Sequence, residues 1–287
     1  EEEIQFGERL TYPTMICGAD NTLFFTARRS FKDRPWFVEL WEKKLGRDWN
    51  RVGPVMLSRH KGYAHFQESL AWGPDHKTIH LCCRFHEGTD KSAYGRLQTV
   101  AYMKSEDFGR TWKRSDGSVI DKPITVGSIE TIARGGVDLN KSLRAGCLAV
   151  SPKGKPHLIY STVVKQKGEA WLAVADGKGK WDRIRLNDHL LPEWRSFNLI
   201  MAGGLSFDHQ GQLHGVGQLQ IGEQNEKIWG DPTNEIVAFN MVGRDRIQFR
   251  SISKFDPKTS HWLPSIERPT GHNVVSSRPG ILFTGGS

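Results

Sequence analysis

SEDFGRTW, residues 105–112, is the stretch of sequence that decides the fold. It fits the pattern Ser-x-Asp-x-Gly-x-Thr-Trp at every position, and each fixed residue type has a structural reason. An aspartate there accepts hydrogen bonds from backbone and hydroxyl groups across a hairpin, glycine supplies a positive φ, and tryptophan packs between sheets. We therefore expect Asp107 to hold a turn together and not to act as a catalytic acid.

Outside this stretch, each of four segments of the chain ends at a tryptophan that lies in a similar local sequence. These residues are Trp49, Trp112, Trp181 and Trp262, at spacings of 63, 69 and 81 residues. Ahead of each tryptophan lies a polar turn followed by an apolar run, at residues 19–24, 74–80, 152–157 and 208–214. Because turn and run recur together, the sequence indicates a structural repeat.

Short runs rich in β-branched and aromatic residues fill the repeats, separated by Gly, Asp, Asn and Pro. They predict four strands in one unit (14–17, 22–27, 36–41 and 51–57) and four in the next (65–72, 78–85, 99–104 and 113–120). No stretch has a sustained helical period. Four-stranded antiparallel units in radial repetition are typical of a β-propeller. We therefore predict an all-β fold, a single β-propeller domain over 1–287, with blade-like units at 10–58, 63–125, 143–187 and 198–267 and a partial unit at 272–287.

The number of blades has two interpretations. Residues 3–6 have the composition to supply an outer strand to the partial unit, which would close a five-bladed ring. Alternatively, the chain is a piece of a larger ring of six or seven blades. We favour the five-bladed ring if the sequence is the whole protein.

Composition limits the classes of function. The chain has 287 residues, 40 Lys plus Arg against 32 Asp plus Glu and a formal charge of +8. No apolar run approaches the roughly eighteen residues that a membrane-spanning helix needs, so we expect no membrane span. The positive charge lies in short patches without an RNA or DNA module, which argues against nucleic acid and fits an acidic glycan.

Cofactors receive no support from the sequence. Four cysteines have neither metal-binding spacing nor the density of a disulfide scaffold, and the histidines form no zinc-like frame. We expect no cofactor, with a structural metal ion left open. The chain begins at Glu1 and shows no signal sequence, but we expect an extracellular or periplasmic location.

The stretch 105–112 resembles the Asp-box, or BNR repeat, of sialidase-like propellers. Three further features resemble the BNR-4 group, which includes polysaccharide lyases such as ulvan lyases. They are Thr-Tyr-Pro at 11–13 before a strand that ends Phe-Phe-Thr-Ala-Arg at 24–28, the continuation of the Asp-box through 112–124, and the pattern of His, inner strand, Asp-turn, Ile-His and His over 65–86. The resemblance extends over roughly residues 10 to 165.

This resemblance implies a shallow cleft over the inner strands and an acidic polysaccharide as the binding partner. In the lyases a Tyr or His removes the proton α to a uronate carboxylate, an Arg neutralises that carboxylate, and β-elimination follows. Tyr12 and Arg28 match the family in motif and in their 16-residue spacing. The family's catalytic His pair, however, lies in a blade before Thr-Tyr-Pro, whereas His65 and His86 have a similar separation one blade later.

The chemistry of these candidates makes sense independently of the resemblance. Removing a proton beside a carboxylate needs a base, a cation for the developing charge and an acid for the leaving oxygen. The catalytic candidates are Tyr12, Arg28, His65 and His86, and the substrate-binding candidates are Arg84, Arg144 and Tyr160. In the structural alternative, Tyr12 packs on Pro13, Arg28 pairs with a surface acid and the histidines are satisfied polar groups of the interior. His80, His157 and His214 recur at one repeat position, which favours a role in blade packing.

Three functions remain open at this stage. The first is a carbohydrate-active propeller that cleaves a uronate-containing polysaccharide by β-elimination. The second is a sialidase-like glycoside hydrolase, for which the arginines at 28, 84, 144 and 278 are available, with Glu68 and Glu130 as carboxylates, but no Tyr-Glu nucleophile pair is evident. The third is a non-catalytic glycan-binding propeller.

Overall fold

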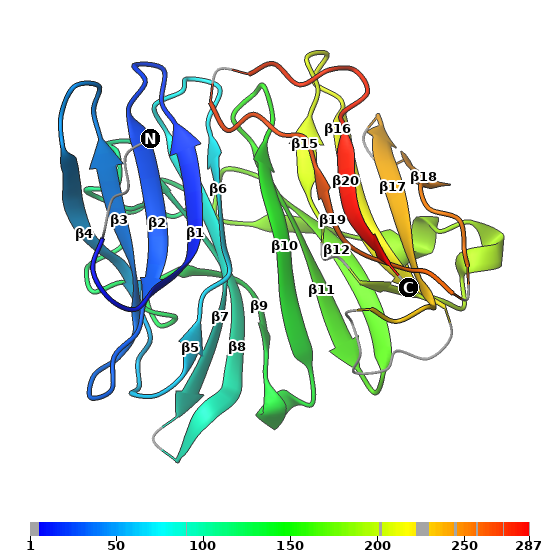
Figure 1. The fold of residues 1–287 in the computed structure, drawn as a ribbon, viewed down its shortest axis with the longest axis horizontal. Coiled ribbons are helices and arrows are strands. Elements are labelled where there is room, and N and C mark those ends of the chain that lie inside the picture. The colour runs from blue at the N-terminus through cyan, green and yellow to red at the C-terminus, as the bar shows by residue number, and fades with distance from the viewer. Residues whose placement is uncertain are drawn as a thin grey trace.

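A computed structural model describes residues 6–89, 91–200, 203–221, 230–243, 246–256, 258–271 and 273–286. The fold is all-β, and its antiparallel sheets stand side by side in Figure 1, with colour running from blue on the left to orange on the right. Among the described residues no helix is long and apolar enough to cross a membrane. The predicted class, a β-propeller of four-stranded antiparallel blades, agrees with this architecture.

The first two sheets are meanders. Sheet one consists of β1 (Leu10–Cys17), β2 (Leu23–Arg29), β3 (Phe37–Lys43) and β4 (Trp49–Leu57) in that spatial order. Sheet two consists of β5 (Ala64–His65), β6 (Glu68–Trp72), β7 (Ile79–Thr89), β8 (Ser92–Ser105) and β9 (Glu130–Gly135). Both β5 and β6 pair with β7, so the inner strand of sheet two is interrupted, and Gln67 at the break has φ 39°.

The other sheets follow in chain order. Sheet three consists of β10 (Ser142–Val150), β11 (Pro156–Val164), β12 (Lys167–Ala175) and β13 (Trp181–Arg185). Sheet four contains β14 (Asn198–Ile200), β15 (Leu205–Phe207), β16 (Leu213–Gln220), β17 (Asn234–Val242) and β18 (Arg246–Ser251). Sheet five pairs β19 (Ser260–Ile266) with β20 (Ile281–Gly286).

Two strand assignments made from the sequence are wrong. The fourth strand of sheet two is β9 and not residues 113–120, which form only isolated bridges such as Lys113 to Val119. Trp262 lies on β19 in sheet five and so does not close sheet four. The proposed closing strand at 3–6 lies mostly outside the described residues. The single domain over 1–287 stays a prediction.

Apolar side chains fill the gaps between neighbouring sheets. The gap between sheets one and two is filled around Leu40, Leu81 and Trp112, which are at most 1% exposed. Tyr102 and Trp181 meet in the gap between sheets two and three, with ring centroids 5.0 Å apart. Burial of such large rings removes much apolar surface from water and holds each sheet against the next.

The stretch 105–112 makes the contacts that its residue types predict. Asp107 accepts hydrogen bonds from the backbone and hydroxyl of Thr111, the latter at 2.6 Å, and from the Ser105 hydroxyl at 2.8 Å. Gly109 has φ 86°, and Trp112 donates its indole N–H to the Gly109 carbonyl at 3.1 Å. Because these hydrogen bonds favour the ionised carboxylate, the pKa of Asp107 lies below its usual value despite its partial burial.

Candidate functional site

Tyr12 and Arg28 come together because β1 and β2 form an antiparallel hairpin. Thr11 is the register partner of Arg28, and the pairing is irregular between Thr11 and Thr14. Tyr12 sits in this irregularity with φ 59° and is 53% exposed. A left-handed backbone is costly for a bulky residue, and such conformations concentrate at functional sites. The bulge therefore turns the Tyr12 side chain toward solvent at the end of the first sheet.

The Arg28 side chain is enclosed by aromatic rings. It is only 8% exposed, and its guanidinium carbon lies 4.7 Å from the Tyr12 ring centroid, 4.9 Å from that of Trp36 and 5.6 Å from that of Tyr63. Such stacking stabilises a partly desolvated guanidinium. Nε donates to the Thr11 hydroxyl and Nη1 to the Ala64 carbonyl, both at 3.0 Å. Arg28 thus joins sheet one to sheet two and is held rigidly.

His65 and His86 lie opposite each other on paired strands. They are register partners between β5 and β7, so their side chains project from the same face of sheet two. The His65 ring also meets the Tyr12 ring at 4.7 Å and 87°. Arg84 lies two residues before His86 on β7 and therefore shares that face. The structure brings the four catalytic candidates and Arg84 to the end of the inner strands at which β5 lies, and β5 is labelled in the lower part of Figure 1.

Both histidines are neutral at neutral pH. Burial, assisted by the positive charges of Arg84 and Arg28, lowers the pKa of His65 to about 4. Burial and Arg84 likewise lower the pKa of His86 to about 4. A neutral imidazole has a lone pair that accepts a proton. His86 Nε2 is buried, because the backbone of β8 approaches it so closely that a Cβ on Gly95 would lie 2.3 Å from this nitrogen.

Arg84 and Arg144 are two cations for which the described residues offer no carboxylate partner. Arg84 Nη1 donates to the Leu143 carbonyl at 2.9 Å, which reaches from sheet two to sheet three. Arg84 Nε and Arg144 Nη1 are buried, and within the described part of the chain neither has a hydrogen-bond partner. Burial and the nearby Arg84 lower the pKa of Arg144 to about 10. Two neighbouring guanidinium groups with unused donors are a natural site for an anion.

Glu68 is a buried acid beside the cluster. It begins β6, just after the break in the inner strand, and burial raises its pKa to about 7, although Arg28 acts in the opposite direction. Its Oε1 is buried without a hydrogen-bond partner among the described residues. Glu68 is therefore a carboxyl group that exchanges a proton near neutral pH.

Tyr160 is separated from the cluster. It is 2% exposed and packs in the core between sheets two and three. Because Ser161, and not Tyr160, is the register partner of Arg144, Tyr160 faces the opposite side of sheet three. The sequence pattern placed it on the right hairpin but did not determine its face.

The histidines of the repeat position make packing contacts. His80 forms a 2.6 Å hydrogen bond with the Tyr102 hydroxyl, His157 bonds the Lys155 carbonyl, and His214 pairs with Asp208 at 2.9 Å. Glu130 accepts bonds from Ser115 and Trp181. Arg278 borders a separate hollow between sheets four and five. No group of three or more His, Cys, Asp or Glu in the described residues is arranged to hold a metal ion.

Trp36 and Tyr63 belong to the site but were not singled out from the sequence. Trp36 precedes β3 and Tyr63 precedes β5, and both meet Arg28. Tyr63 also meets the His86 ring at 5.9 Å. Their signal in the sequence is weak, because an aromatic residue just ahead of a strand is equally typical of core packing.

Comparisons with known proteins agree with this architecture. A family model described as "BNR repeat-containing family member" matches residues 1–189. No curated protein matches the chain. Among solved structures, an ulvan lyase of polysaccharide lyase family PL25, bound to -[GlcA(1-4)Rha3S]-, has a TM-score of 0.62 and 13% identity over 89% of this chain and 58% of that chain.

Two further structures are similar at comparable identity. A protein of unknown function from Dyadobacter fermentans has a TM-score of 0.57 and 12% identity, covering 90% of this chain and 72% of that one. A Hadza microbial sialidase has a TM-score of 0.51 and 10% identity, covering 90% of this chain and 50% of that one. The chain spans 58% of the length of the ulvan lyase structures that it matches. At these identities the likeness establishes the fold alone, a β-propeller.

Proposed function

The chain belongs to the BNR repeat-containing family, and from that premise we propose that it cleaves a uronate-containing acidic polysaccharide by β-elimination. The observation that carries this proposal is the pair of neutral histidines beside buried guanidinium groups that have unused N–H donors. A uronate supplies what this cluster lacks, a carboxylate with an acidic proton on the adjacent carbon. We expect the enzyme to act outside the cytoplasm, where such polymers occur.

The proposed reaction assigns one role to each side chain. The substrate carboxylate pairs with the guanidinium groups of Arg84 and Arg144, which spreads the charge that develops when the neighbouring C–H bond breaks. His65 takes that proton, because its imidazole is neutral and its ring meets that of Tyr12, whereas His86 Nε2 is buried. Tyr12, in contact with His65, donates its hydroxyl proton to the leaving glycosidic oxygen. The C–O bond breaks and a carbon–carbon double bond forms in the uronate ring, so atoms and charges balance.

Arg28 has a positioning role in this scheme. Its two hydrogen bonds and three aromatic neighbours hold Tyr12 and the β5 segment in place. A bound carboxylate would also raise the pKa of His65, since a negative charge offsets the repulsion from Arg84 and Arg28. Substrate binding therefore strengthens the base that acts on it.

The test is a scan of acidic polysaccharides with the purified protein. Ultraviolet absorbance records unsaturated uronate, and reducing ends are assayed in parallel. We expect wild-type protein to raise both signals, His65→Gln to lose about 10²–10⁴-fold in rate, and Arg144→Met to lose about 10²–10³-fold. Arg47→Met, at an exposed turn of sheet one, is the matched control and should retain full activity.

One observation favours a glycoside hydrolase as the second candidate. Glu68, with its raised pKa beside Arg28, has the protonation behaviour of a general acid. Reducing ends without ultraviolet absorbance, abolished by Glu68→Gln, would replace the lyase with the hydrolase. Binding without either signal would leave the glycan-binding propeller.

A further inference from the structure

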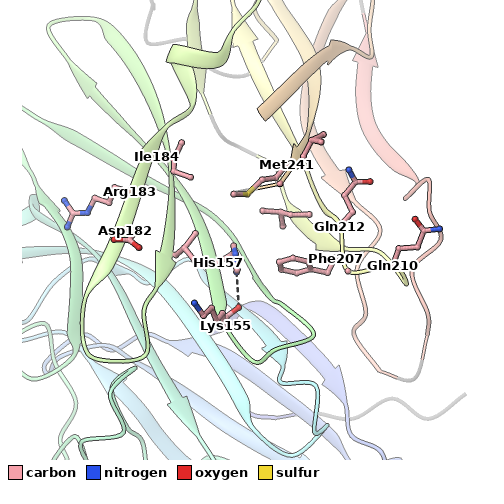
Figure 2. A pocket seen from close by; sticks show the side chains of 14 residues that line it. Lys155, His157, Asp182, Arg183, Ile184, Phe207, Gln210, Gln212 and Met241 are labelled. Carbon is pink, nitrogen blue, oxygen red and sulfur yellow. Dashed lines mark hydrogen bonds between the residues drawn. The ribbon is translucent and has the colours of Figure 1, made fainter. Parts of the chain in front are cut away.

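A groove of about 1060 Å³ opens between sheets three and four, and its lining residues are drawn in Figure 2. Apolar side chains from both sheets form its walls, and polar groups surround its mouth. The walls are built by Val174, Ile184, Phe207, Leu213 and Met241. None of the residues proposed for catalysis lines it. Its volume lies just above the roughly 300–1,000 Å³ typical of small-molecule sites.

In sheet four an arginine stands where two of the other sheets have a tryptophan. Trp49 and Trp181 each begin the outer strand of their sheet, and each pairs with the last residue of the preceding strand. In sheet four the same register position is taken by Arg246, paired with Val242. The sequences agree, since GRDW at 46–49 corresponds to GRDR at 243–246. Trp181 packs in the gap between sheets two and three, whereas Arg246 is exposed and does not pack between sheets three and four.

An arginine leaves the gap open for a physical reason. A guanidinium buried among apolar walls without a partner carries a high desolvation cost, so Arg246 stays in solvent. A tryptophan at that position would bury a large ring between the sheets, as Trp181 does against Tyr102. The hollow is thus a specific departure from the repeat.

The walls of the groove present a fixed aromatic ring. Phe207 points into the hollow in Figure 2, and its ring meets that of His157 at 5.0 Å and 79°. His157 is itself held by a 2.9 Å hydrogen bond to the Lys155 carbonyl. Because both rings are locked, Phe207 offers a surface that loses little conformational freedom when a ligand binds.

Two amide side chains border the same hollow from a rigid turn. The backbone N–H groups of Gln210 and Gln212 both donate to Asp208 Oδ1 at 2.9 Å. Asp208 also binds His214, so the turn is fixed on both sides. Each glutamine amide provides donors and acceptors at once, which suits hydroxyl groups. Figure 2 shows both amides on the sheet-four side of the groove.

The groove is remote from the catalytic candidates. Along β10, Arg144 precedes Ala149 by five residues, and Ala149 is the register partner of His157 in the groove. At about 3.3 Å per residue this separates the two sites by roughly 16 Å along the strand. A ligand in the groove therefore does not occupy the histidine–arginine cluster.

We propose that the groove between sheets three and four is a second, non-catalytic site that binds a segment of a polysaccharide chain. An aromatic ring packs against the C–H face of a sugar, and adjacent amides bind its hydroxyls. Three charged residues line the groove, and the guanidinium of one of them, Arg183, donates to the Ile132 carbonyl. Recognition here therefore depends mainly on ring faces and hydroxyls. The ligand class rests on the proposed function, but the site does not need the catalytic cluster.

Affinity electrophoresis in gels that contain alginate, polygalacturonate or dextran tests the proposal. We expect at least one polymer to retard the wild-type protein, and we expect Phe207→Ala and Arg246→Trp each to weaken that binding at least fivefold. Phe255→Ala removes a phenylalanine that is 48% exposed outside the groove and serves as the matched control. Arg246→Trp should fill the hollow without removing any wall, so a loss of binding in this variant cannot be attributed to unfolding caused by truncation.

Salt removes binding through exposed charges, and the Arg144→Met change removes a cation of the histidine–arginine cluster. At about 0.5 M salt, binding through exposed charges is strongly screened, whereas binding through ring faces persists. Retardation that survives salt and the Arg144→Met change, but not Arg246→Trp, would establish the groove even if no polysaccharide is cleaved. Wild-type mobility unaffected by every polymer, or equal retardation of wild type, Phe207→Ala and Arg246→Trp, would overturn the proposal.

Discussion

Substituting Gly109 by alanine should destabilise the protein through a collision between two sheets. Gly109 has φ 86°, and a Cβ at this position would lie 2.1 Å from Leu40 Cδ2 and 3.7 Å from Trp112 Cζ2. Leu40 is 1% exposed on β3. The turn of 105–112 therefore approaches the neighbouring sheet so closely that only glycine fits without movement.

Two costs add in Gly109→Ala. Placing a side chain on a left-handed backbone costs about 1–2 kcal/mol. Forcing a methyl group into a packed core costs about 1–3 kcal/mol more. We therefore expect the free energy of unfolding to fall by about 2–5 kcal/mol.

Gly117 supplies a matched control. It has φ 90°, but a Cβ there would meet nothing within 4 Å. Gly117→Ala should therefore carry only the backbone cost, about 1–2 kcal/mol. The difference between the two variants isolates the contact with Leu40.

Urea unfolding followed by tryptophan fluorescence and circular dichroism measures both changes. The slope of the unfolding free energy against urea concentration should stay constant, while the midpoint of the transition shifts to lower urea. In a Leu40→Ala background the collision is relieved, so Gly109→Ala should cost less there than in the wild type. If the two glycine variants differ by less than about 0.5 kcal/mol, or if the Leu40 background changes nothing, the argument from close packing is refuted.

Two further predictions concern stability. Burial lowers the pKa of His80 to about 4, and its pKa in the unfolded state is about 6.5, so the unfolded state binds more protons between these pH values. The free energy of unfolding should therefore fall as the pH drops from about 6.5 to 4. In urea titrations His80→Gln should reduce this dependence on pH, and an unchanged dependence would contradict the assignment. Arg268 Nη1 donates to Ser69 Oγ at 2.9 Å and to the Leu70 carbonyl at 3.2 Å. Arg268→Met should therefore lower the free energy of unfolding by about 2–3 kcal/mol and accelerate proteolysis between β19 and β20. Lys258→Met, at an exposed turn, should change neither.

The repeat was predictable because its signals are local. A turn residue with positive φ, a capping aspartate and an alternating strand all depend on neighbours in sequence, so the first-sheet strands were expected close to where they occur. The fourth strand of sheet two was not, because residues 113–120 have the composition of a strand but form isolated bridges while β9 takes the outer position. Tertiary packing decides which segment forms the outer strand of a sheet.

The candidate site was predictable in its residue types and less so in its directions. Tyr12 and Arg28 were expected to meet through the first hairpin, and the register places Arg28 opposite Thr11. Tyr160 lies on the expected hairpin but faces away from Arg144, because an irregularity in β10 sets the pairing of Arg144 with Ser161. A shift of one residue reverses every side chain of a strand, and a single sequence does not locate such a shift.

Asp107 and the pair Arg84 and Arg144 differ in how their polar groups are satisfied. Asp107, in the 105–112 turn, accepts several hydrogen bonds from neighbouring residues, so its carboxylate is stabilised by the folded protein itself. Arg84 and Arg144, by contrast, keep buried N–H groups without partners among the described residues, although each such group costs about 1–3 kcal/mol. Folding alone gives no reason to retain that cost beside neutral histidines. In the proposed reaction the substrate carboxylate removes this cost on binding, and for this reason we propose to test the histidine–arginine end for chemistry.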